Sequence, residues 1–72
     1  MSEFMTGKIK WFSGKLMYGF INGDDGVSYF FHKTNIAKEY KNEYLRHNTK
    51  VKFKQMANEK GDFADDIRIV SE

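Results

Sequence analysis

The chain has 72 residues, 40% of them hydrophobic, with a net charge of +2 and neither cysteine nor proline. This length fits one domain over residues 1–72, and the lack of cysteine excludes disulfides and thiolate metal sites. No apolar run reaches the roughly 18 residues of a transmembrane helix, and the first five residues lack the basic start of a signal peptide, so we expect a cytoplasmic protein. Residues 1–4 are expected to be disordered or foreign to the natural chain, since Met5 is also a plausible start.

Charge is distributed unevenly along the chain. Residues 34–58 carry a net charge of +4 and residues 59–72 a net charge of −3, so a positive surface can lie beside a negative one. Lys50, Lys52 and Lys54 alternate with apolar residues. We interpret them as the solvated face of an edge strand, where lysines discourage aggregation, in preference to a phosphate-binding stripe.

Five β-strands are predicted, over residues 5–12, 17–21, 27–32, 49–56 and 63–70. Turn residues 22–26 should close a hairpin between the second and third strands. In residues 34–48, Ile36, Tyr40 and Tyr44 recur every four residues, which predicts a short helical turn or two. The fold class is therefore all-β, a five-stranded antiparallel Greek-key barrel whose third and fourth strands are joined by a long loop.

Aromatic side chains make up 17% of the sequence, more than so small a core can easily hold, so some should be exposed on a binding surface. Period-two alternation gathers Tyr18, Phe20, Phe30 and His32 on one face, and Trp11 can join them from the first strand. Unstacked bases need flat apolar partners, and lysines can meet the phosphates. The pattern therefore predicts binding of single-stranded nucleic acid.

Three segments of the chain resemble the bacterial cold shock domain family. Residues 7–12 (GKIKWF) resemble its opening, residues 16–21 (LMYGFI) its first RNA-binding motif and residues 29–33 (YFFHK) its second. The resemblance, which covers residues 5–70, implies an OB-fold barrel that binds single-stranded RNA or DNA as an RNA chaperone or gene-expression regulator. By position, it implies binding by Lys10, Trp11, Tyr18, Phe20, Phe30 and His32, with Phe12 at the edge of the site.

The full set of candidate nucleic-acid contacts adds lysines that would follow the backbone; it comprises Lys8, Lys10, Trp11, Phe12, Lys15, Tyr18, Phe20, Phe30, His32 and Lys33. The chain departs from the family at three of its site positions. Leu16 and Met17 stand where the family has lysine and glycine, and Lys33 stands where it has an aromatic residue. These departures motivate an alternative hypothesis, a protein-interaction module with weakened nucleic-acid binding and a contact surface at Tyr40 and Tyr44.

Enzymatic activity is not expected, because no nucleophile has an orienting base and no glycine-rich phosphate loop is present. His32 and His47 lack the partners of a metal site or a catalytic triad. The acidic residues at 62, 65 and 66 lack the spacing of a calcium loop. We therefore expect no cofactor and no metal, and we expect His32 to stack on a base and donate a hydrogen bond.

Overall fold

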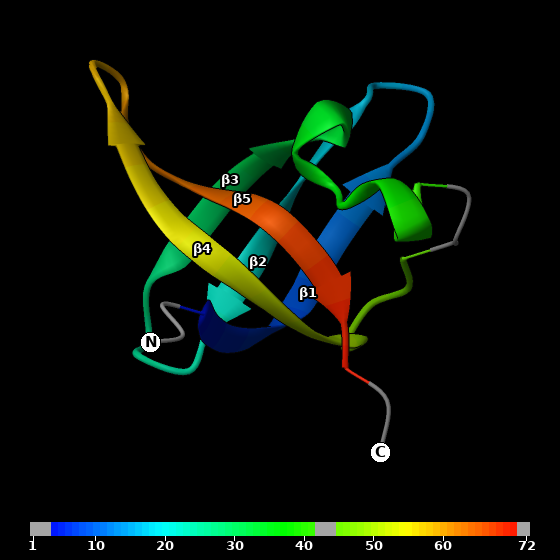
Figure 1. The fold of residues 1–72 in the computed structure, drawn as a ribbon, viewed down its shortest axis with the longest axis horizontal. Helices are drawn as coiled ribbons and strands as arrows, with labels where there is room; N and C mark the ends of the chain where they lie inside the picture. The colour runs from blue at the N-terminus through cyan, green and yellow to red at the C-terminus, as the bar shows by residue number, and fades with distance from the viewer. Residues whose placement is uncertain (1–3, 42–44, 71–72) are drawn as a thin grey trace.

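The structure, a computed structural model, describes residues 4–41 and 45–70. Five strands, β1 (Phe4–Ser13), β2 (Tyr18–Gly23), β3 (Ser28–His32), β4 (Lys50–Asn58) and β5 (Gly61–Ile69), form a closed barrel in the order β1-β2-β3-β5-β4 (Figure 1). The predicted five-stranded all-β barrel is confirmed. Across the described residues, no helix has the length and apolar content needed to cross a membrane.

One strand pair differs from the antiparallel arrangement that we expected. The β3–β5 pair is parallel, with Phe30 opposite Phe63, whereas the other four pairs are antiparallel. A ring of five strands cannot alternate in direction all the way round, because five is odd. Closure of the barrel therefore requires at least one parallel pair, and here it is the short contact between β3 and β5.

The long connection between β3 and β4 contains two 3-10 turns, η1 (Lys33–Asn35) and η2 (Lys38–Tyr40), as predicted. Ile36 is 3% exposed and Tyr40 packs against the core, so this side of the connection faces the barrel. The backbone N–H of Ala37 donates to the carbonyl of Ile67 at 2.9 Å, which joins the connection to β5. Tyr44 lies outside the described residues.

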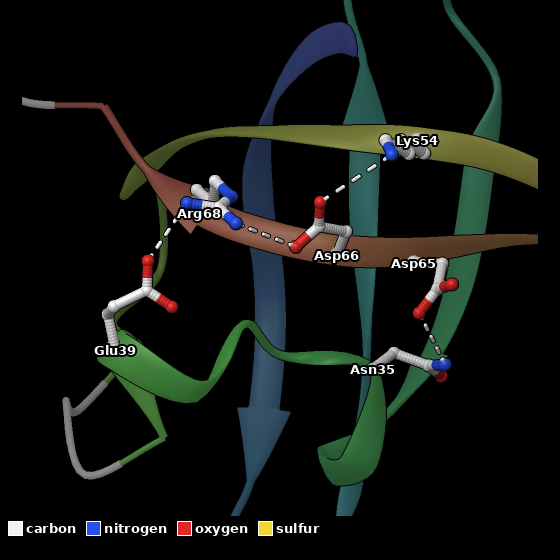
Figure 2. Close-up of polar contacts among 6 residues, drawn as sticks. All are labelled: Asn35, Glu39, Lys54, Asp65, Asp66 and Arg68. Atoms are coloured by element: carbon white, nitrogen blue, oxygen red, sulfur yellow. Dashed lines mark hydrogen bonds and ion pairs between the residues drawn. The ribbon is translucent and has the colours of Figure 1, made fainter. Parts of the chain in front are cut away.

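Polar side chains fasten this connection to the barrel, as Figure 2 shows. The Arg68 guanidinium on β5 lies 3.0 Å from Glu39 in η2 and 3.3 Å from Asp66. The amide of Asn35 donates to Asp65 at 3.2 Å. Asp65 and Asp66 thus serve as structural partners of the connection, of β5 and, through Lys54, of β4.

The core contains the inward-facing residues of all five strands. Tyr29 and Phe31 point into it from β3, as the alternation predicted, and are 1% and 0% exposed. The Tyr29 hydroxyl, otherwise an unsatisfied group, donates to Asp25 at 2.7 Å. A Cβ at Gly23 would lie 2.8 Å from the Tyr29 ring, so a glycine there makes room for it. Among the residues that the structure describes, the other fully buried side chains are Ile9, Ile21, Leu45, Val51, Phe53, Ala64 and Ile67.

The interpretation of β4 as an edge strand is wrong. β4 pairs with β1 on one side and with β5 on the other, so closure of the barrel leaves it no free edge. Val51 and Phe53 are buried, and the three lysines alternate with them on the outer surface. Gln55, predicted on the side of Val51, is exposed, although Ala64 opposite it on β5 is fully buried. Toward their connecting turn, β4 and β5 continue past the barrel as a projecting hairpin (Figure 1).

Candidate nucleic-acid interface

A cluster of aromatic rings lies on the outside of the barrel. Cross-strand register sets Phe20 of β2 opposite both Trp11 of β1 and Phe30 of β3, while Tyr18 lies opposite His32. We call Trp11, Tyr18, Phe20 and Phe30 the ring cluster. The regular alternation of β2 and β3 turns Tyr18, Phe20 and Phe30 outward, while Gly19 and Ile21 on β2 turn inward.

The rings of this cluster contact one another, but the contacts leave part of the ring faces exposed to solvent. Ring centroids lie 5.3 Å apart for Trp11 and Tyr18, 5.6 Å for Tyr18 and Phe30, and 5.8 Å for Phe20 and Phe30, at interplanar angles of 33–71°. Trp11 remains 37% and Phe30 40% exposed. Tilted and edge-to-face contacts of this kind fix each ring through its neighbours and leave ring surface open to a further flat partner.

A β-bulge decides which way Trp11 points. The register with β2 shifts between Ile9 and Trp11, so Lys10 is an extra residue in β1. Strict alternation would bury Trp11 beside Ile9, but the extra residue turns Trp11 outward. The Lys10 carbonyl at the bulge accepts a 2.7 Å hydrogen bond from Nδ1 of His47.

The same bulge turns Phe12 away from the ring cluster. Its ring stacks on buried Phe31, with centroids 5.5 Å apart and planes 16° apart, and packs against the core. Phe12 was predicted at the edge of the site. The structure shows it half-buried, in a packing role that supports β1 and β3, and its place at the edge of the site stays a prediction.

His32 is held in one orientation at the end of β3. Its backbone N–H donates to the side chain of Asn35 at 2.8 Å, and its Nδ1 accepts from the Thr34 backbone N–H at 3.2 Å. With Nδ1 accepting, the proton of the neutral ring is assigned to Nε2. Since His32 is opposite Tyr18 and half-buried, it adds a fixed polar group beside the ring cluster.

The predicted lysines lie on the strands and turns that carry the ring cluster, at different positions along them. Lys8, Lys10 and Lys15 are exposed, and Lys33 is half-buried. The Lys33 N–H donates to the Met17 carbonyl at 2.8 Å, so the turn between β1 and β2 is joined to the end of β3. In that turn Leu16 is 57% and Met17 45% exposed, so the departures from the family motif add apolar surface next to Tyr18 in the chain.

Phe63 on β5 was missed by the sequence interpretation. It lies opposite Phe30 and, with Phe20 and Phe30, lines a hollow of about 470 Å³. The other lining residues belong to the β4–β5 hairpin: Asn58, Lys60, Gly61 and Asp62. No local pattern indicated this neighbour, because the parallel contact between β3 and β5 joins residues far apart in the sequence.

Comparison with known proteins agrees with this architecture. A family model described as the 'Cold-shock' DNA-binding domain matches residues 5–70, the span of the whole barrel. A cold shock-like protein of Thermotoga maritima is 37% identical over 67 residues, which cover 92% of this chain and 98% of that protein. The chain therefore belongs to the cold-shock DNA-binding domain family, as its motifs predicted.

Proposed function

We propose that this protein binds single-stranded RNA or DNA with low sequence selectivity, by stacking bases on the ring cluster. The observation that carries the proposal is the contiguous set of four rings outside the barrel, with Trp11 and Phe30 more than a third exposed. Other rings of the chain, such as Phe31 and Phe53, are fully buried and fill the core. The rings of the cluster therefore lie outside a core that other aromatic residues already occupy. Membership of a nucleic-acid-binding family supports the same function.

The chemistry of the surface favours single strands. A duplex hides the faces of its bases, whereas an unpaired strand can offer each base to a ring. Every base has such a face, so stacking discriminates little between sequences. Lys8, Lys10, Lys15 and Lys33 would follow the phosphates, and the Nε2–H of His32 would donate to a base edge. Because only the unpaired state binds, the protein would shift weakly folded RNA toward open forms, which is the activity of an RNA chaperone.

Alanine substitution in the ring cluster tests this proposal. Phe30→Ala and Phe20→Ala should each weaken binding of a short oligothymidine by about 1–3 kcal/mol, or about 5- to 150-fold. Val27→Ala is the matched control, since Val27 is also an apolar residue beside β3, is 42% exposed and lies outside the ring cluster. A folded Phe30→Ala variant that binds as tightly as the Val27→Ala control would contradict the assignment of the site.

The alternative, a protein-interaction module, is favoured by one observation. Leu16 and Met17 expose apolar side chains where the family has a lysine and a glycine. Tyr40 does not favour it, because this ring packs against the core. The alternative predicts a protein partner that stays bound after nuclease treatment and is lost in Leu16→Ser. Release of every partner by nuclease would exclude it.

A further inference from the structure

Five lysines share the outer surface of two paired strands. β1 contributes Lys8 and Lys10, and β4 contributes the other three; we call Lys8, Lys10, Lys50, Lys52 and Lys54 the basic surface. The β1–β4 register sets Lys8 opposite Lys50 and Thr6 opposite Lys52. Neither strand contains an acidic residue.

Protection of a free strand edge does not account for this concentration of positive charge. Lysines protect free strand edges, but β4 has a neighbour on both sides. The Lys54 ammonium group pairs with Asp66 at 3.9 Å, and the Lys54 side chain is still 48% exposed.

The basic surface is continuous with the ring cluster. The outward positions of β1 run from Trp11 through Lys10 and Lys8 to Thr6, a distance of about 16 Å at 3.3 Å per residue. An aromatic residue also lies at the far end. There the ammonium groups of Lys52 and Lys54 lie 5.0 and 5.6 Å from the centroid of the Phe4 ring. A chain that leaves Trp11 along β1 therefore meets lysines and this ring, with the Asp24 carboxylate beside Thr6 at the far end.

We propose that the basic surface binds the phosphate backbone of a single strand that extends beyond the ring cluster. The inference rests on the proposed function and adds to it a second contact region that depends on ligand length. The ring cluster would hold a few bases, and the lysines would hold the backbone of the following nucleotides by charge alone. Continuity with the rings favours nucleic acid over another anionic partner, since one strand can occupy both regions.

The test compares two ligand lengths and two charge-matched variants. Oligothymidines of about 6 and about 16 nucleotides span the range of sites that one OB-fold covers. Lys52→Gln/Lys54→Gln removes two charges from the basic surface. Lys38→Gln/Lys41→Gln removes two exposed charges at η2, on the connection that packs against β5. Binding is measured by fluorescence anisotropy over a range of salt concentrations, and folding of each variant by circular dichroism.

The proposal predicts an effect confined to the long ligand and to the first variant. Loss of two phosphate contacts should reduce the slope of log K against log salt by about 1.4 for the long strand, at about 0.7 per contact. Binding of the short strand should be unchanged. Equal slopes for both variants on the long strand, with the short strand still bound, would overturn the inference and leave the proposed function standing. Failure of the unmodified protein to bind the short strand would instead overturn both.

Discussion

Met17 adopts a backbone conformation that its side chain disfavours. Its φ is +67°, in the left-handed region, where an L-residue with a Cβ costs roughly 1–2 kcal/mol. The other described non-glycine residues with positive φ are Asn48 and Asp66, types that tolerate this region. The family motif has glycine at the position of Met17. The structure thus gives a physical reason for that glycine, since it would adopt this φ without strain.

Met17→Gly is therefore expected to stabilise the protein. Relief of about 1–2 kcal/mol of strain is partly offset by about 0.5–1 kcal/mol of backbone entropy that glycine gains in the unfolded chain. Met17 is 45% exposed, so little packing is lost with its side chain. The net gain is about 0.5–1 kcal/mol, which corresponds to about 2–8 °C in melting temperature for a domain of this size.

Thermal melting followed by circular dichroism measures this gain. Leu16→Gly is the matched control, because Leu16 is in the same turn, is 57% exposed and is not among the residues with positive φ. This control should melt below the unmodified protein, since it adds the entropy cost and relieves no strain. The reasoning is refuted if Met17→Gly melts at or below the unmodified protein while Leu16→Gly behaves as expected.

Two further substitutions test hydrogen bonds that stabilise the barrel, one between Tyr29 and Asp25 and one between His47 and the Lys10 carbonyl. The hydrogen bond from Tyr29, followed by that from the Val27 N–H, lowers the pKa of Asp25, and Asp25 in turn raises the pKa of Tyr29 to about 12. The unfolding free energy should therefore fall as the pH rises from 10.0 toward about 12, and it should also fall as the pH decreases below 3.8. The urea midpoint of Tyr29→Phe should depend less on pH than that of the unmodified protein in both ranges. His47→Ala should lower the unfolding free energy by about 0.5–1.5 kcal/mol, because the Lys10 carbonyl loses its partner; an unchanged urea midpoint would contradict that role.

The part of the site on β2 and β3 could be predicted from the sequence because its determinants are local. These strands alternate regularly, and a short turn joins them, so Tyr18, Phe20 and Phe30 fall on one face in any register that buries Ile21 and Phe31. The long connection contains helical turns, as predicted, but Ile36 lies between them in an extended conformation and bridges to Ile67.

The remaining features depend on contacts that local patterns do not contain. The outward direction of Trp11 and the inward direction of Phe12 follow from one extra residue at Lys10, and alternation alone would reverse both. Phe63 joins the aromatic surface only through the parallel pairing of β5 with β3. The environment of the β4 lysines was misjudged because strand pairing on both sides of β4 is a property of the closed barrel.

Stacking of unpaired bases on the ring cluster is tested most directly by the fluorescence of Trp11, the single tryptophan of the chain. A short oligothymidine and a duplex of the same length are titrated into the protein at two salt concentrations. The single strand should quench Trp11 and the duplex should not, and higher salt should weaken the single-strand response in line with a few phosphate contacts. A folded protein whose Trp11 fluorescence is unchanged by both ligands, or quenched equally by both, would contradict base stacking at this surface.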